Sequence, residues 1–373
     1  MNTPKKIFVT GGHLTPAIAV IDEIRRRNVP WEIVFIGRKR AMEGVSDRSH
    51  EEDVMASYGI RFLPLTAGRL QRTFTAHSIK SFCKVPVGCI QAWYYCWKEK
   101  PVCILSFGGY VAVPIVISAA FFHIPVITHE QTTVSGLANT IIAYFAKKVC
   151  VTFEETLGAF PKNKVVVTGL PVRKELFESV QPPFPVDEKK YPIIYITGGS
   201  TGSVSLNDVL FPLVPRLIKH CTVIHQTGGL SAGRAFQVKR MLSSAEQVRY
   251  IVHDYFGAQD VAWILQHATL VIGRSGANTV MEIAMLGKMA LFVPLPWAGS
   301  GEQMQNAQWL VKMGSAQVLP QKEASPEKIL HNIEQMIAKK HIYIEHAKKI
   351  SRLVPRDGDK RVADELMLVV NRK

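Results

Sequence analysis

The residues with the clearest chemical potential are Thr10-Gly11-Gly12-His13, close to the start of the chain. They follow the apolar run Ile7–Val9, which is typical of a β-strand, and they precede apolar residues at helical spacing. A glycine pair at a strand-to-helix turn lets the backbone approach a ligand closely, and the first N–H groups of the helix favour an anion. His13 places a titratable ring beside that anion, so we predict that it acts as a general base. Taken alone, the same histidine could simply cap the helix.

Two more loops in the first half of the chain combine strand ends with glycine or polar residues. Ser106-Phe107-Gly108-Gly109-Tyr110 repeats the glycine pair, and two such loops could hold a diphosphate between two helix N-termini. Thr128-His129-Glu130-Gln131, with Gly136 and Asn139 downstream, could hydrogen-bond a hydroxylated substrate. Each loop, read singly, is also compatible with an ordinary turn or a helix cap.

The second half contains two further glycine-rich loops. Thr197–Gly202 suits an anion. It lacks the G-x-x-x-x-G-K-[S/T] spacing of a P-loop and has no acidic residue about 20 positions on, which argues against a mononucleotide kinase and a dehydrogenase. Arg274–Glu282 begins with a turn that could bind phosphate and ends with a carboxylate that could accept both hydroxyls of a ribose. Glu302-Gln303 and Asn306 are suited to sugar hydroxyls.

These loops need a scaffold of parallel strands, and the chain alternates strand-like and helix-like segments throughout. The expected strands cover residues 7–10, 32–36, 102–106, 125–128, 148–152, 192–197, 222–226, 270–272 and 290–293. Residues 181–185 are the most linker-like stretch, and residues 361–370 predict a terminal amphipathic helix. We predict an α/β protein with two doubly wound domains, residues 1–168 and 169–350, followed by a terminal segment 351–373 that packs back on the first domain.

Composition limits the class of protein further. The 373 residues include 45 Lys and Arg against 30 Asp and Glu, a formal charge of +15 that favours polyanions or an anionic membrane. No recognised nucleic-acid-binding module is evident, so nucleic acid is a weak alternative. The six cysteines form no C-x-x-C pair and fit a reducing cytosol. The only D-x-D, Asp357-Gly358-Asp359, is interpreted as a turn and helix cap rather than a metal site.

Basic residues interleave with aromatic ones between residues 69 and 98, as a membrane-interfacial surface requires. The residues expected to touch the membrane are Leu70, Phe74, Phe82, Trp93 and Tyr94. The alternative is that the aromatic side chains belong to the core and the charges are solvated.

Six blocks in this order resemble the MurG-type N-acetylglucosaminyltransferases of peptidoglycan synthesis, in glycosyltransferase family 28. They are T-G-G-H-x-x-P-A at 10–17, F-G-G-Y-V at 107–111, H-E-Q at 129–131, T-G-x-P-V-R at 168–173, G-G-S-x-G at 198–202 and R-S-G-A-x-T-V-x-E at 274–282. Gln303 and Asn306 complete the set, so the resemblance covers essentially the whole chain.

The resemblance implies the glycosyltransferase-B fold, in which two Rossmann-like domains face a central cleft. It also implies inverting transfer of N-acetylglucosamine from UDP-N-acetylglucosamine to undecaprenyl-linked lipid I, giving lipid II. The donor-binding residues would be Thr10, Gly11, Gly12, Arg173, Ser200, Ala277, Asn278, Thr279, Val280, Met281, Glu282 and Gln303. The acceptor-binding residues would be Gly108, Gly109, Tyr110, His129, Glu130, Gln131, Thr132 and Asn139.

The predicted scheme uses His13 as the base and requires neither a metal nor another cofactor. The expected location is the cytoplasmic face of the cell membrane, as a peripheral protein, with a cell-wall synthesis complex as a further partner. Three alternatives stay open: a related enzyme with another lipid acceptor such as diacylglycerol, a UDP-sugar 2-epimerase, and a non-catalytic cell-wall scaffold.

Overall fold

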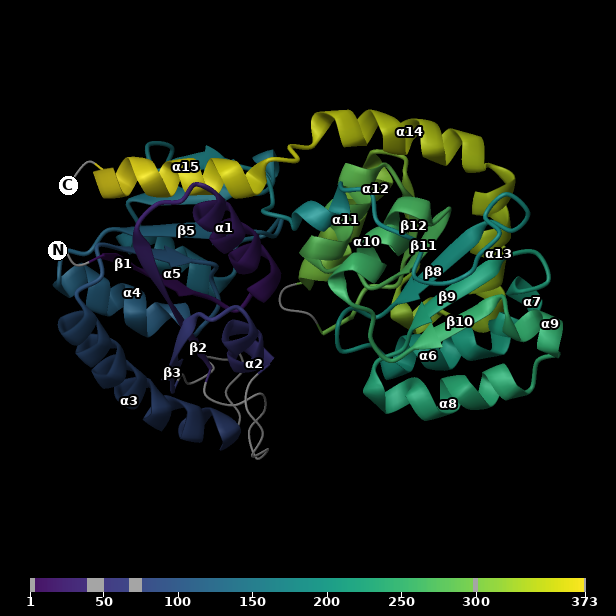
Figure 1. Cartoon of the computed structure of the whole chain (residues 1–373), viewed down its shortest axis with the longest axis horizontal. Coiled ribbons are helices and arrows are strands. Elements are labelled where there is room, and N and C mark those ends of the chain that lie inside the picture. The colour runs from purple at the N-terminus through teal and green to yellow at the C-terminus, as the bar shows by residue number, and fades with distance from the viewer. Residues whose placement is uncertain (1–3, 39–49, 67–75, 298–300, 372–373) are drawn as a thin grey trace. The chain divides into compact units, whose positions relative to one another are not determined.

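The computed structural model describes residues 4–38, 50–66, 76–297 and 301–371, with backbone alone for residue 50 and residues 76–85. Contacts divide the chain into two compact units, residues 1–173 with 356–373 and residues 174–355. Each unit is built on its own parallel sheet (Figure 1). The domain limits expected from the sequence, at 168/169 and 350/351, stay predictions.

The first unit contains a sheet of seven parallel strands in the order β3-β2-β1-β4-β5-β6-β7 among the described residues. The strands are β1 (Lys5–Thr10), β2 (Trp31–Arg38), β3 (Arg61–Leu65), β4 (Cys103–Ser106), β5 (Val126–Glu130), β6 (Lys148–Val151) and β7 (Val165–Val167). Thr10, Ser106 and Thr128 stand side by side in the register of β1, β4 and β5. The loops predicted to carry chemistry therefore leave the same edge of this sheet.

Helices cover both faces of this sheet, which is why its central strands are almost continuously apolar. One core lies under α1 (Leu14–Arg26), α2 (His50–Ser57) and α15 (Gly358–Asn371). The other lies under α3 (Ala76–Glu99), α4 (Ala112–Phe121) and α5 (Leu137–Phe145). A short 3-10 helix, Glu154–Ala159, precedes β7. In the described residues, no helix combines the length and the apolar character needed to span a bilayer.

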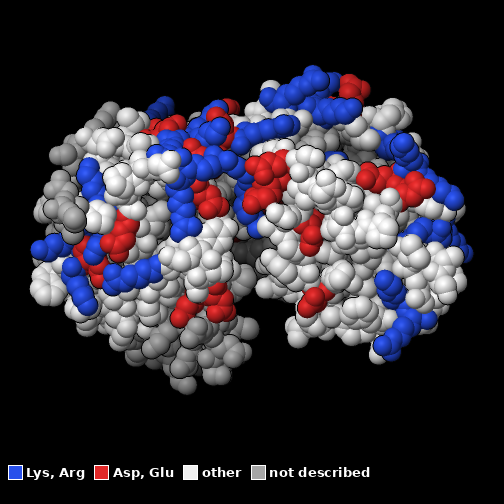
Figure 2. Space-filling model, in the orientation of Figure 1, with Lys and Arg blue, Asp and Glu red and all other residues white. Residues whose placement is uncertain are grey.

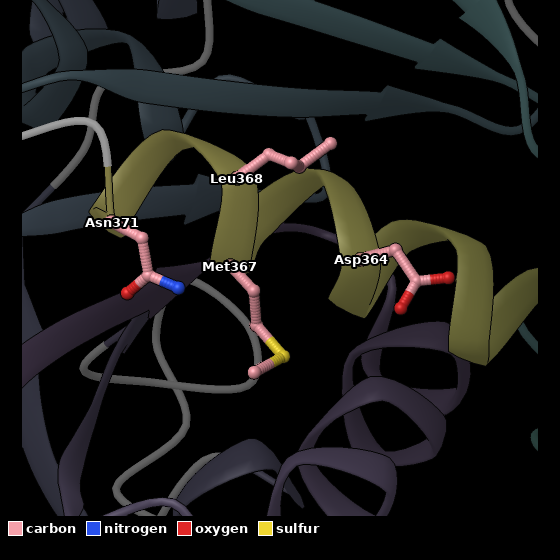
Figure 3. A pocket seen from close by; sticks show the side chains of 4 residues that line it. All are labelled: Asp364, Met367, Leu368 and Asn371. Carbon is pink, nitrogen blue, oxygen red and sulfur yellow. The ribbon is translucent and has the colours of Figure 1, made fainter.

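Helix α15 brings the end of the chain back to the first unit, where it packs beside α1 (Figure 1). Val362 and Leu366 are fully buried, and Arg26 of α1 donates a 3.0 Å hydrogen bond to Asp359. Gly358 packs against the Leu170 carbonyl, beyond the carboxyl end of β7. A shallow pocket on the C-terminal half of α15 is lined by Asp364, Met367, Leu368 and Asn371 (Figure 3). None of the predicted site residues lines that pocket.

The second unit contains a sheet of six parallel strands in the order β10-β9-β8-β11-β12-β13 among the described residues. The strands are β8 (Ile193–Thr197), β9 (Thr222–Gln226), β10 (Tyr250–His253), β11 (Leu270–Gly273), β12 (Met289–Phe292) and β13 (Ala316–Val318). The helices are α6 (Val204–Leu210), α7 (Val214–Leu217), α8 (Gly229–Arg240), α9 (Ser244–Gln247), α10 (Ala258–His267), α11 (Ala277–Leu286), α12 (Glu302–Lys312), α13 (Pro326–Ala338) and α14 (Lys340–Leu353). Short 3-10 turns cover Lys174–Leu176, Phe211–Leu213 and Gln321–Glu323. Lys and Arg side chains gather along α14 (Figure 2).

The segment expected to be a linker is packed onto the second unit. Phe184 makes edge contacts with the rings of Phe256 and Trp263, with centroids 5.6 and 5.9 Å apart. Just before this segment, the carbonyls of Leu176 and Glu178 accept hydrogen bonds from the Gln266 side-chain amide, at 3.1 and 2.7 Å. Residues 181–185 therefore form an irregular, largely exposed segment that packs on the second unit through Phe184.

Candidate active site

The first loop of the sheet edge is fixed by close backbone contacts. The Phe107 N–H donates to the Thr10 carbonyl at 2.7 Å, which joins the ends of β1 and β4. A Cβ on Gly11 would lie 2.7 Å from the Phe107 Cβ, so only glycine fits between the two loops. Gly12 is exposed and its N–H donates to the Gly108 carbonyl at 3.1 Å. The first and second glycine loops therefore interlock into one surface.

His13 follows this loop as the N-terminal cap residue of α1, and a hydrogen bond to the second loop orients its ring. Nδ1 lies 3.0 Å from the carbonyl oxygen of Phe107. Because a carbonyl only accepts, Nδ1 must carry the proton, and the neutral ring keeps a lone pair on Nε2. Burial lowers the pKa of His13 below its ordinary value, while the Phe107 bond and the charges of Glu130 and Glu51 oppose that shift. The ring is therefore a neutral base, held in one tautomer, at neutral pH.

The second loop provides backbone rather than side chains to the site. Gly108 and Gly109 have φ of +72° and +79°, conformations that residues with a Cβ rarely adopt. A Cβ on Gly109 would lie 3.1 Å from the Gly12 nitrogen, so a side chain here would also crowd the first loop. Tyr110 follows, half-buried, just before α4.

A buried hydrogen-bond network adjoins the second glycine loop. The Glu130 carboxylate accepts bonds from Asn139 Nδ2 at 2.7 Å and from the N–H and hydroxyl of Thr132 at 3.1 and 2.9 Å. The amide group of Asn139 fills the space where a Cβ on Gly108 would stand. Glu130 is thus the acceptor that fixes the loop after β5, and its negative charge also acts on His13.

Removing Asn139 tests this network. Asn139→Ala leaves one carboxylate oxygen of Glu130 without its amide partner and opens a space under Gly108, so we expect a loss of about 1–3 kcal/mol in unfolding free energy. Urea denaturation measures the loss, with Asn163→Ala, an exposed asparagine, as the matched control. Equal stability of the two variants would contradict the assigned role.

His129 and Gln131 are buried beside this network, at 1% and 4% exposure. His129 Nε2 lies 3.0 Å from the Gly169 carbonyl and so carries the proton, while burial lowers the pKa of His129 to about 4. Its ring also contacts that of Phe107, with centroids 5.9 Å apart. His129 therefore connects β5 to the segment that leads to Arg173 and packs against Phe107 of the second loop. The acceptor-binding role of the H-E-Q group stays a prediction.

Sequence reasoning did not find Arg38 and Glu51, which belong to the same sheet edge. Glu51 is buried, and it accepts the Arg38 backbone N–H at 3.0 Å. The Arg38 guanidinium extends to Tyr110 Oη at 3.5 Å. The sequence could have indicated Arg38, because it ends β2 and so stands at the same edge of the sheet as the predicted loops.

In the second unit, three loops leave the carboxyl ends of the adjacent strands β8, β11 and β12. The loop after β8 passes so near the Thr227 carbonyl that a Cβ on Gly202 would collide with it, and the tip residue Ser200 is exposed. The Gln226 side chain donates to the Gly199 carbonyl at 2.9 Å. These contacts hold the loop rigid while leaving its tip open to a ligand.

Arg274 lies directly after β11, in the loop that the sequence predicts to bind phosphate. It is 6% exposed, and its guanidinium binds the Ser203 and Ser205 hydroxyls, both at 2.8 Å, and the Val293 carbonyl at 2.7 Å. Burial lowers the pKa of Arg274 to about 10, so it stays charged at neutral pH. It joins the loop after β8 to the end of β12.

The loops after β11 and β12 are likewise connected. Ser275 Oγ donates to the Gln303 carbonyl at 2.7 Å, and the Gln303 side-chain oxygen accepts the Leu295 N–H at 3.0 Å. Gly276 is extended and begins α11 without a side-chain cap, so the first N–H groups of that helix are available to an anion. Glu282 is half-buried on the same helix. Of the other expected donor contacts, Asn278, Thr279 and Gln303 are half-buried and Ala277, Val280 and Met281 are buried.

The chain matches the glycosyltransferase family 28 N-terminal domain over residues 10–151 and the C-terminal domain of that family over residues 193–362. It is 33% identical over 355 residues to a Clostridium tetani protein named UDP-N-acetylglucosamine–N-acetylmuramyl-(pentapeptide) pyrophosphoryl-undecaprenol N-acetylglucosamine transferase. The match spans 93% of this chain and 94% of that one. The chain belongs to glycosyltransferase family 28. This identifies it as a glycosyltransferase, as the sequence resemblance predicted.

Two further similarities support this family assignment. A Treponema denticola protein of the same name is 34% identical to this glycosyltransferase over 328 residues, covering 85% of this chain and 83% of its own. The crystal structure of Acinetobacter baumannii MurG matches with a TM-score of 0.71 and 26% identity, over 97% of this chain and 98% of the other. The two Rossmann-like sheets and this likeness confirm the predicted glycosyltransferase-B fold.

The predicted membrane contacts are only partly within the described residues of this glycosyltransferase. Leu70 and Phe74 lie outside them, and the side chain of Phe82 is not described. Trp93 and Tyr94 are each 44% exposed on α3. The ring of Trp93 contacts those of Trp97 and Phe122, with centroids 6.4 and 5.4 Å apart, and Phe121 extends the group. We call these five residues, Trp93, Tyr94, Trp97, Phe121 and Phe122, the aromatic surface.

Proposed function

We propose that this glycosyltransferase transfers N-acetylglucosamine from UDP-N-acetylglucosamine to lipid I, forming lipid II with inversion at the anomeric carbon. The names of the relatives supply the two substrates. The observation that carries the chemistry is His13, whose Nδ1–H is committed to the Phe107 carbonyl so that Nε2 is free to accept a proton.

The acceptor hydroxyl has a pKa far above 7 and needs a base as it attacks the anomeric carbon. His13 Nε2 takes that proton, and its lowered pKa keeps the ring neutral before the reaction. A single displacement on the face opposite the leaving group inverts the anomeric centre. Uridine diphosphate leaves with growing negative charge, which the N–H groups after Gly276 and around Ser200 stabilise together with Arg173.

The donor is bound by the second unit in this proposal. Glu282 accepts the ribose hydroxyls, and the turn from Gly276 into α11 binds the diphosphate. Gln303 is fixed through its side-chain oxygen, which leaves its amide N–H groups for the sugar. Arg274 supports the donor site without touching the donor, since its guanidinium already binds the Val293 carbonyl and the Ser205 hydroxyl.

The acceptor is bound by the first unit, with the lipid in a membrane. The aromatic surface presents Trp97 at 54% and Phe121 at 67% exposure, and the Lys98 ammonium lies 5.4 Å from the Tyr94 ring centroid. Aromatic rings with adjacent cations suit the interface of an anionic bilayer. We propose peripheral attachment to the cytoplasmic face of the membrane, where a cell-wall synthesis complex would be a further partner.

A transfer assay tests the proposed function. The purified chain is incubated with radiolabelled UDP-N-acetylglucosamine and either a short-chain lipid I analogue or diacylglycerol. We expect label to enter the lipid I analogue with release of UDP, and none to enter diacylglycerol. Transfer to diacylglycerol, or release of free sugar without an acceptor as a 2-epimerase would give, would contradict the proposal.

A further inference from the structure

Arg38 connects the end of β2 to the second glycine loop through Tyr110. It is the last residue of β2, and β1 lies between β2 and β4 in the sheet. Neighbouring strands are about 4.8 Å apart, so a side chain that joins the end of β2 to the loop after β4 must pass over the end of β1. The side chains of Arg38 and Tyr110 together span this distance, because Arg38 Nη1 lies 3.5 Å from the hydroxyl of Tyr110. Its positive charge therefore lies at the same edge of the sheet as the loop that leads from Gly11 to His13.

The arginine is held in this position by Glu51. One oxygen of the buried Glu51 carboxylate accepts the Arg38 backbone N–H at 3.0 Å, and the other lies 3.4 Å from Nη2. Gly37 makes this possible, since a Cβ there would lie 2.6 Å from the same carboxylate. Arg38 is thus anchored at both its backbone and its guanidinium, although 39% of its side chain is exposed.

The guanidinium retains capacity for a ligand. It carries five N–H donors in a planar fork, and within the described part of the chain its two polar contacts are long, at 3.4 and 3.5 Å. Such a fork matches two oxygens of a phosphate, which form shorter and stronger bonds than a tyrosine hydroxyl does. Glu130, another carboxylate that acts on His13, is already occupied by Asn139 and Thr132 and does not compete.

We propose that Arg38 binds the diphosphate of the lipid-linked acceptor and so selects acceptors that carry it. This inference rests on the proposed function and goes beyond it, because it assigns acceptor recognition to a residue outside the family's motifs. The acceptor, rather than the donor, is the partner because Arg38 lies beside Tyr110, which is expected to bind the acceptor, whereas the diphosphate of the donor is assigned to the turn from Gly276 into α11. Arg38 therefore determines specificity and leaves proton transfer to His13.

The test compares two acceptors with matched variants. Initial rates give kcat and KM for a short-chain lipid I analogue and for the same analogue with a single phosphate. We expect Arg38→Met to raise KM for the diphosphate acceptor about 10- to 100-fold and for the monophosphate acceptor much less, as the loss of one charged bidentate contact implies. KM for UDP-N-acetylglucosamine should stay within about twofold. Arg38→Lys should recover part of the affinity, since it restores the charge without the fork.

Arg25→Met is the control for net charge, because Arg25 lies in the last turn of α1, at the other end of that helix from His13. Thermal melting checks each variant, and Arg38→Gln, which keeps a donor for Glu51, replaces Arg38→Met should the latter not fold. Unchanged acceptor KM, or an equal rise for both acceptors, would overturn the assignment of Arg38. If the unmodified protein transfers nothing to the lipid I analogue, the proposed function itself fails, whatever the variants do.

Discussion

Replacing His13 with alanine is expected to reduce kcat for transfer to a lipid I analogue by about 10²- to 10⁴-fold. The reason is chemical: the acceptor hydroxyl loses the Nε2 lone pair that takes its proton, while both substrates keep their other contacts. KM for UDP-N-acetylglucosamine should therefore change little. Steady-state kinetics of the purified variant measures both constants.

The matched control is His341→Ala, which removes an exposed histidine of α14 in the second unit. We expect it to retain full activity. A His13→Ala variant that is correctly folded and transfers at the unmodified rate would show that another group is the base.

Replacing Arg274 with methionine is expected to disturb the donor side most strongly. The substitution leaves the Val293 carbonyl and two serine hydroxyls without their charged partner, so we expect a loss of about 3 kcal/mol in unfolding free energy. Because the loop around Ser200 then loses its connection to the end of β12, affinity for UDP-N-acetylglucosamine should fall as well. Chemical denaturation and calorimetric titration with the donor measure the two effects.

Arg234→Met provides the comparison, since Arg234 is paired with Asp208 on the exposed surface of the same unit. Surface pairs of this kind contribute about 0–1 kcal/mol. An Arg274→Met variant that is as stable as Arg234→Met and binds the donor normally would refute the role assigned to Arg274.

The interior of both sheets was predictable from the sequence, whereas their edges were not. All nine expected strands are present, with small shifts at their ends. The four strands that sequence missed, β3, β7, β10 and β13, are the outermost strands of the two sheets. Edge strands are partly exposed, as in β7, where all three residues are half-buried. In sequence the missed strands are short or interrupted: β7 and β13 have three residues each, and β3 contains Pro64, so they lack the longer apolar run by which a buried parallel strand is recognised.

The loops of the candidate site were predictable because a strand end followed by glycine is a local pattern. What these residues contact was not, since that depends on segments far apart in the chain. Arg274 and His129 lie in loops expected to bind ligands, and only the structure shows that both are buried and hydrogen-bonded within their own units. Arg38 and Glu51 were missed for the same reason, because they meet each other and Tyr110 only once β2, α2 and the loop after β4 are folded together.

The pH dependence of kcat/KM in the unmodified protein and in His13→Gln tests the central claim most directly. Transfer requires the neutral ring of His13, so kcat/KM should fall as pH decreases through the pKa of that group. Since burial lowers this pKa, the acid limb should have its midpoint below 6.5, and the residual activity of His13→Gln should lack that limb. A midpoint at or above 6.5, or the same limb in the variant, would contradict the assignment of His13 as the general base.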